Sequence, residues 1–148
     1  MTTMSRRCAF PALPWRCDVH VFPVRVYYSD TDCSGIVYHA RYLDFAEHAR
    51  TEMFRSVGGG QQELLEQQIC FVVKSIAIEF NLPGKLDDLL SVESQIAEAK
   101  HFSLTLSQKV KRGEETLAVL SVRIACLNAE TLRPLPLPQD LLSAMQAL

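Results

Sequence analysis

The sequence lacks a long hydrophobic segment and a marked excess of charge of either sign. No apolar run among the 148 residues approaches the roughly 20 residues that cross a bilayer, and the N-terminus has no continuous signal-peptide core. Fifteen Lys and Arg residues stand against 17 Asp and Glu residues, giving a net charge of −2. We therefore expect no membrane span, no nucleic-acid binding and a cytoplasmic location.

Paired cysteines and metal-ligand spacings are also absent from the sequence. The five cysteines are odd in number and widely spaced, and no C-x-x-C pair occurs. These features favour reduced thiols over a disulfide framework or a zinc ribbon. Because His20 and His48 belong to no recognisable ligand spacing, we expect neither a metal nor a redox cofactor.

The chain does contain enough apolar sequence for one hydrophobic core. Its 148 residues are 48% apolar, which suits a single domain and is too little for two. Residues 1–18 contain Pro11 and Pro14 and show no sustained period, so we interpret them as an N-terminal extension. The folded domain is expected to span residues 19–148.

Hydrophobic periodicity predicts an α+β domain. Val24, Val26 and Tyr28 alternate as in a strand, and from His39 apolar residues recur at helical spacing for about five turns, up to the three glycines 58–60. The later segments predict a short helix at 62–67, strands at 69–80, 89–96, 102–110 and 117–127, and a closing helix at 140–147. Four consecutive strands with short connections predict a mostly antiparallel sheet around one long helix.

A polar turn between the first strand and the long helix carries the chemistry. Asp32 is expected close to the helix N-terminus, where free backbone N–H groups and the helix dipole receive negative charge. Gly35 lets a ligand approach the backbone closely. The turn therefore supplies an acid or base together with an oxyanion site.

The turn contains the motif Tyr28-Ser-Asp-Thr-Asp-Cys-Ser-Gly-Ile-Val-Tyr-His39. Together with the order of elements, this motif resembles that of the hotdog-fold acyl-CoA thioesterases. The branch is that of 4-hydroxybenzoyl-CoA thioesterase and the YbgC-type enzymes. Similar segments at 50–55, 71–74 and 86–89 extend the likeness over most of residues 20–138. The resemblance implies a curved, mostly antiparallel sheet wrapped around one central helix, and homodimers or homotetramers with sites at subunit boundaries.

The resemblance also implies site residues. The second acid of the pair, Asp32, carries catalysis, and the backbone N–H of His39 is the oxyanion donor. The expected substrate-binding residues are Gly35, Tyr38, Val72, Val73, Lys74, Lys100, His101 and Ser103. Val72 to Lys74 edge the pantetheine tunnel by family position, whereas Lys100, His101 and Arg112 are candidates for the coenzyme A phosphates, with a solvated strand end as the alternative.

Several alternatives stay open at the level of sequence. Asp32 acts either as a nucleophile or as a general base, or only shapes the turn. Asp30 is interpreted as a structural brace and Cys33 as a small neighbour. Glu47 on the long helix is the rival catalytic carboxylate; its alternative role is a pairing with Arg50 or Lys74.

Three functions are compatible with these features. The leading one is an acyl-CoA thioesterase without a cofactor, acting on acyl-CoA. A non-catalytic scaffold that binds acyl-CoA or acyl carrier protein is the second. A hotdog dehydratase or hydratase is weakened because its Gly-Asp-x-Asn-Pro-hydrophobic-His motif does not occur in the chain.

Overall fold

The structure is a computed structural model and describes residues 19–148, so the predicted extension 1–18 lies outside the described residues. The elements, in chain order, are β1 His20–Arg25, the 3-10 helix η1 Tyr28–Asp30, α1 Arg41–Arg55, α2 Gln61–Glu66, β2 Ile69–Phe80, β3 Leu89–Ala99, β4 Ser103–Arg112, β5 Glu115–Asn128 and α3 Gln139–Gln146. This order agrees with the predicted one: a strand, a long helix, four strands and a closing helix.

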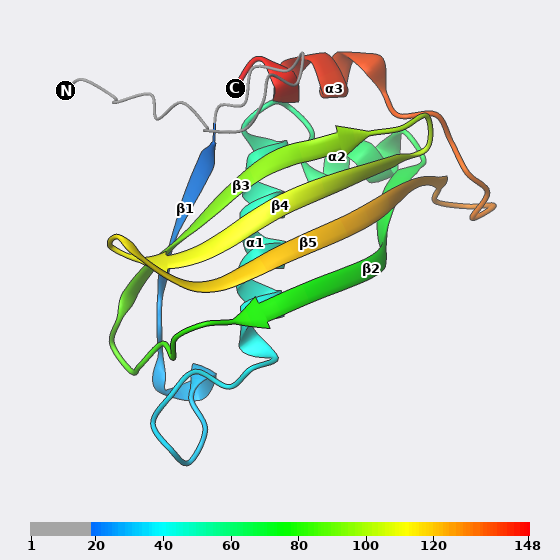
Figure 1. Ribbon diagram of the computed structural model, residues 1–148. Helices are drawn as coiled ribbons and strands as arrows, with labels where there is room; N and C mark the ends of the chain where they lie inside the picture. The colour runs from blue at the N-terminus through cyan, green and yellow to red at the C-terminus, as the bar shows by residue number, and fades with distance from the viewer. Residues whose placement is uncertain (1–18) are drawn as a thin grey trace.

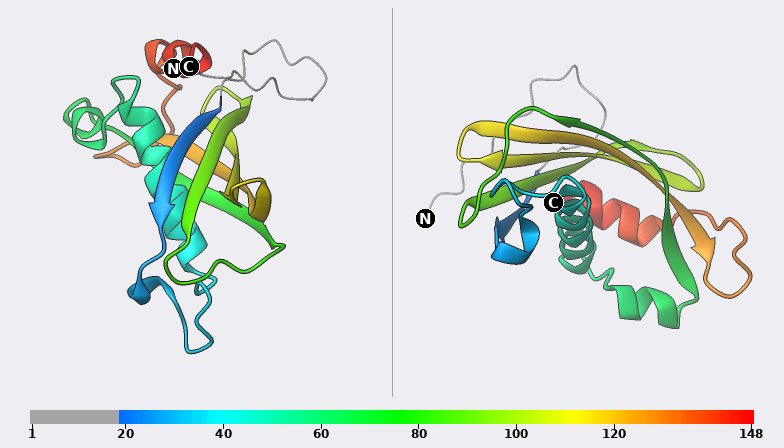
Figure 2. Two further views of the ribbon diagram at one scale, coloured as in Figure 1. Left: turned by 90° about the vertical axis from the view of Figure 1, so that its left-hand side faces the viewer. Right: turned by 90° about the horizontal axis from the view of Figure 1, so that it is seen from below.

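Five strands form one antiparallel sheet in the order β1-β3-β4-β5-β2. The sheet curves, and α1 lies against its concave face (Figure 1; Figure 2, right). The consecutive strands β3, β4 and β5 pair as neighbours because short connections favour antiparallel hairpins. The predicted α+β hotdog fold is therefore confirmed, with β1 and β2 as the two edges of the sheet.

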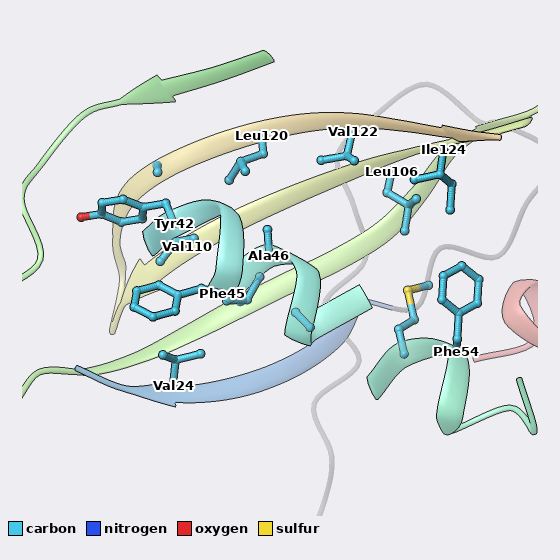
Figure 3. Packing of buried hydrophobic residues seen from close by; sticks show 14 of the residues in the cluster. Val24, Tyr42, Phe45, Ala46, Phe54, Leu106, Val110, Leu120, Val122 and Ile124 are labelled. Carbon is cyan, nitrogen blue, oxygen red and sulfur yellow. The ribbon is translucent and has the colours of Figure 1, made fainter. Parts of the chain in front are cut away.

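The core lies between α1 and the sheet. Tyr42, Phe45, Ala46, Ala49 and Met53 recur at three- and four-residue steps and form the buried stripe of the helix. They pack against inward-facing residues of the strands, among which Figure 3 labels Leu106, Val110, Leu120, Val122 and Ile124. Each large aliphatic side chain buried there contributes about 1.5–3 kcal/mol.

The segment between β1 and α1 differs from the predicted continuation of the strand. β1 ends at Arg25, and Tyr28 lies in η1 with 83% of its surface exposed. The backbone N–H of Tyr27 donates to Oδ2 of Asp30 at 2.9 Å, which turns the chain away from the sheet. The predicted helix start at His39 was likewise early: α1 begins at Arg41, and its 15 residues make about four turns.

Within residues 19–148 no helix is long and apolar enough to cross a membrane. The described cysteines Cys33, Cys70 and Cys126 are free thiols. Burial raises the pKa of Cys126 to about 11, so this thiol is protonated at neutral pH and packs as a small apolar side chain. Among residues 19–148, no three Asp, Glu, His or Cys side chains form a group that could hold a metal ion.

Candidate active site

Residues 31–38 form a small closed turn at one end of the sheet. Thr31 bridges Val37, the Asp32 N–H donates to the Ile36 carbonyl at 3.0 Å, and the Gly35 N–H donates to the Asp32 carbonyl at 3.0 Å. Gly35 has a φ of 76°, in the left-handed region that side chains rarely adopt. The glycine predicted for close approach is thus also needed to close the turn.

The Asp32 carboxylate lies on the exposed surface of this turn. Its Oδ1 accepts the backbone N–H of Ser34 at 2.8 Å, the geometry of an Asx turn. Among the described residues it forms no ion pair, and no hydrogen bond is donated to Oδ2. The Asx turn therefore uses Oδ1 of Asp32 and leaves Oδ2 available to react.

The backbone just before α1 offers a free donor. The Tyr38 N–H donates to the Asp30 carbonyl at 2.8 Å and the Arg41 N–H donates to the Tyr38 carbonyl at 2.9 Å. Between these two, the His39 N–H has no acceptor within residues 19–148. An unpaired N–H at a helix start, aided by the dipole, suits a developing oxyanion.

Aromatic rings surround this donor. The ring of His39 lies 4.5 Å from the Tyr38 ring and 6.5 Å from the Phe80 ring, measured between centroids. Phe80, at the end of β2, also packs edge-on against Tyr42 at 5.5 Å. Tyr38 and His39 are exposed, so an apolar and aromatic surface flanks the free amide.

Asp30 braces the turn. Its Oδ2 accepts the Tyr27 N–H at 2.9 Å, and its Oδ1 lies 3.9 Å from Nε of Arg41. These contacts agree with the structural role expected for Asp30. Its side chain is also less exposed than that of Asp32.

A second loop supports the turn, a role that no local sequence pattern indicated. The Val37 N–H donates to the Gly84 carbonyl at 2.8 Å, and Ile36 bridges Lys85. The Gly84 N–H in turn donates to Oη of Tyr42 at 3.0 Å. Burial raises the pKa of Tyr42, which keeps the hydroxyl protonated. The Pro83-Gly84 pair had signalled only the end of a strand.

Glu47 lies on the exposed face of α1, away from the turn. It is six residues after Arg41, about 9 Å along the helix axis. Thr51 Oγ1 donates to its Oε1 at 2.7 Å, and Nε2 of His48 lies 3.8 Å from its Oε2. The alternative pairing of Glu47 with Arg50 is not a direct contact, since the buried Nη1 of Arg50 donates to Oε1 of Gln108 at 3.0 Å. Burial lowers the pKa of Arg50, and the negative charge of Glu47 partly offsets this effect.

Val72, Val73 and Lys74 lie on the outermost strand, β2. Lys74 occupies the register shift between Val73 and Ser75, where the strand bulges. Phe80 is the last residue of β2 and lies beside His39. Val73 precedes Phe80 by seven residues, so it lies roughly 20 Å from Phe80 along the strand, at about 3.3 Å per residue. One chain therefore does not bring these three residues to Asp32.

Lys100, His101 and Ser103 lie in and next to the turn between β3 and β4. The Lys100 N–H donates to the Ser103 carbonyl at 2.8 Å. β3 begins near the Asp32 turn and runs about 33 Å to Ala99, so this group lies at the opposite end of the sheet (Figure 1). Arg112 is ion-paired with Asp88 at 2.7 Å and with Glu115 at 3.2 Å, which contradicts a free phosphate contact.

Comparisons with known proteins identify a family and several relatives of this chain. A family model described as the thioesterase-like superfamily matches residues 26–145. The Haemophilus influenzae protein named acyl-CoA thioesterase YbgC is 45% identical over 128 residues, covering 86% of this chain and 94% of that protein. The Escherichia coli O157:H7 acyl-CoA thioester hydrolase YbgC is 38% identical over 123 residues, with coverage of 82% and 92%.

A solved structure gives the same result. The crystal structure of a probable thioesterase from Bartonella henselae superimposes with a TM-score of 0.77 at 38% identity. The match covers 81% of this chain and 99% of that chain. The likeness thus spans nearly the whole of the solved protein.

Proposed function

The chain belongs to the thioesterase-like superfamily, and we propose that it is an acyl-CoA thioesterase, which converts an acyl-CoA and water to the free acid and coenzyme A. The observation that carries the proposal is the turn at residues 31–38. Among residues 19–148, the Asp32 carboxylate that it presents makes no ion pair, and the turn leads directly to the His39 N–H, which has no acceptor in this part of the chain. The relatives named as acyl-CoA thioesterases support the substrate class.

Asp32 has two routes to hydrolysis. In the first, its carboxylate attacks the thioester carbon, the C–S bond breaks, coenzyme A leaves as the thiolate, and water then hydrolyses the mixed anhydride. In the second, the carboxylate accepts a proton from a water molecule that attacks the same carbon; the C–S bond then breaks, and coenzyme A leaves as the thiolate and takes up that proton. Both routes need a carboxylate that faces solvent, and Asp32 has this exposure.

The His39 N–H stabilises the negative charge that develops on the thioester oxygen in either route. A single donor of this kind is worth about 3 kcal/mol of activation free energy. Because the donor is a backbone group at the start of α1, its position is set by the helix. Gly35 and the ring of Tyr38 are proposed to contact the acyl group and its thioester.

The remaining predicted contacts point to a site shared by two copies of the chain. No strand of the described part of the chain pairs with the outer edge of β2, which exposes Val73, Ile76 and Phe80 by 47%, 37% and 51%. An antiparallel pairing of two such edges would bring Val72, Val73 and Lys74 of the second copy toward the first copy's turn. We therefore propose a homodimer as the active unit, with the Lys100, His101 and Ser103 group also contributed from the second copy.

A tetramer of such dimers, acyl carrier protein as a further partner and a cytoplasmic location stay predictions of the sequence. The number of chains in the active unit is measurable by light scattering in solution. Substitution of Ile76 by Lys on the exposed edge should convert the dimer to a monomer, because two buried ammonium groups would face each other across the edges.

The proposal is tested with the purified full chain and a panel of acyl-CoAs, by following release of the free thiol. We expect the substitution Asp32→Asn to lower kcat at least about a hundredfold, since the amide neither attacks nor accepts a proton. Glu47→Gln and Asp140→Asn, on the exposed faces of α1 and α3, should retain activity. Full activity in Asp32→Asn would reject the catalytic role of Asp32. If the parent protein binds acyl-CoA but releases no thiol, the result would favour the non-catalytic scaffold that binds acyl-CoA.

A further inference from the structure

The Asp32 turn takes its position from bonds to other segments. Four consecutive residues, 32–35, are exposed, and Val37 is the turn's one residue buried in the core. Outside the turn, backbone hydrogen bonds connect it to η1 through Tyr38 and to the loop before β3 through Val37. A segment with so few buried contacts is fixed by such bonds, and it moves when they are lost.

Gly84 connects the turn to α1. Its carbonyl accepts the Val37 N–H at 2.8 Å, and its N–H donates to Oη of Tyr42 at 3.0 Å. Figure 3 shows the hydroxyl of Tyr42 at the end of the apolar cluster, directed away from the aliphatic side chains. The buried residue Gly84 therefore connects the turn of Asp32 to α1, which begins beside the His39 N–H.

An ion pair holds the rest of this loop, residues 83–88. Nη1 of Arg112 donates to Oδ2 of Asp88 at 2.7 Å and to the Pro83 carbonyl at 3.2 Å. Asp88 Oδ2 also accepts the Lys85 N–H at 2.9 Å. Burial opposes the ionisation of Asp88, but the hydrogen bonds from Arg112 and Lys85 outweigh it, so the pKa of Asp88 is lowered.

We propose that Tyr42 and the Arg112–Asp88 pair are positioning residues for thioester hydrolysis, an inference that rests on the proposed function. They fix residues 83–88, and through the Val37–Gly84 hydrogen bond they set the position of Asp32 relative to the His39 N–H. None of the three contacts the reacting atoms. Their loss should therefore impair the chemical step more than substrate binding.

The test uses single substitutions in the full chain. Tyr42→Phe removes only the acceptor for the Gly84 N–H and keeps the buried ring, whereas Arg112→Gln removes the charge that holds Asp88. Lys111→Gln is the matched control, because Lys111 is the neighbouring residue of β4 and pairs with Glu93 at 3.2 Å outside the loop. For each variant, kcat and KM are measured together with amide hydrogen exchange at Val37 and Gly84.

We expect Tyr42→Phe and Arg112→Gln to lower kcat about tenfold, with KM changed less than about twofold. Exchange at Val37 and Gly84 should accelerate at least about tenfold in Tyr42→Phe, and Arg112→Lys should recover part of the lost kcat. Lys111→Gln should match the parent. If kcat is unchanged in Tyr42→Phe and Arg112→Gln, with or without faster exchange, the inference is overturned. The proposed function is then still tested separately by Asp32→Asn. A parent without thiol release would overturn both.

Discussion

The Asp32 turn and the buried polar cluster of Arg50, Gln108 and Ser94 differ in how their charged group is accommodated. Asp32 is exposed, and its Oδ2 receives no hydrogen bond from the described residues. Arg50 is 7% exposed and donates to the side chain of Gln108, which is itself fully buried. Water can solvate an unpaired group at the first position, whereas an unpaired group at the second would lower stability. The difference separates the turn proposed as the catalytic site from a cluster that stabilises the fold.

The largest expected effect is the loss of activity in Asp32→Asn without a loss of stability. The Asn side-chain oxygen can still accept the Ser34 N–H, so the free energy of unfolding should change by less than about 0.5 kcal/mol. Urea unfolding of the parent and the variant measures this difference. A destabilisation above about 2 kcal/mol would show that Asp32 serves the fold, and the contrast with Arg50 would be lost.

Gln108→Leu tests the other half of the comparison. Gln108 accepts from Arg50 and donates to the Ala46 carbonyl at 2.9 Å and to Oγ of Ser94 at 2.8 Å. Leucine would leave these groups buried and unpaired, so we expect a loss of about 3 kcal/mol in the free energy of unfolding.

Ser107→Ala, at the preceding position of β4 and on the opposite face of the sheet, is the control and should change stability by less than about 0.5 kcal/mol. Chemical denaturation of the two variants measures the difference. Equal stability of Gln108→Leu and the parent would mean that Arg50 finds another partner or reaches solvent.

Gly84→Ala should have an intermediate effect on stability, because the loop and the turn meet closely. An added Cβ would lie 2.9 Å from Cγ2 of Val37 and 3.2 Å from Oη of Tyr42. We expect a loss of about 2 kcal/mol together with reduced kcat, since both neighbours must move. Gly60→Ala is the control, as its nearest contact is 3.9 Å away and its φ is −59°. Comparable stability of both variants would contradict a tight contact at Gly84.

The smallest expected effect is a pH dependence of stability caused by His20. Burial lowers the pKa of His20 below 6.5, an effect that the nearby Glu52 only partly offsets, and its Nδ1 is buried without a partner among the described residues. Below pH 6.5 the unfolded state therefore binds more protons than the folded state, so stability should rise as the pH increases toward 6.5 and then level off.

Unfolding midpoints measured from about pH 5 to about pH 8 would detect this rise. The substitution His20→Gln should flatten it, and His48→Gln on the exposed face of α1 should not. An equal slope in His20→Gln and the parent would assign the pH dependence to other groups.

The fold was largely predictable because its elements have strong local patterns. The predicted strand 69–80 coincides with β2, and the stripe from Tyr42 to Met53 is the buried face of α1. The failures occurred where a specific hydrogen bond, local in one case and between distant segments in the other, overrides the pattern. Tyr28 continues the alternation of β1, but the hydrogen bond from Tyr27 to Asp30 bends the chain first. Arg50 has Glu47 near it in sequence, but Gln108 is 58 positions away and was not a visible partner.

The sequence by itself determined the class of the domain and the place of the Asp32 turn between the first strand and the long helix, because these depend on periodicity and on residues close together in the chain. The tertiary structure decided how that turn is held and which residues one chain can bring to it. Tyr42, Gly84, Asp88 and Arg112 meet only when β2, β3 and β4 are folded against α1. The other predicted substrate contacts, on β2 and after β3, lie roughly 20 to 33 Å along a strand from the Asp32 end of the sheet. Composition and sequence spacing alone do not reveal this distance.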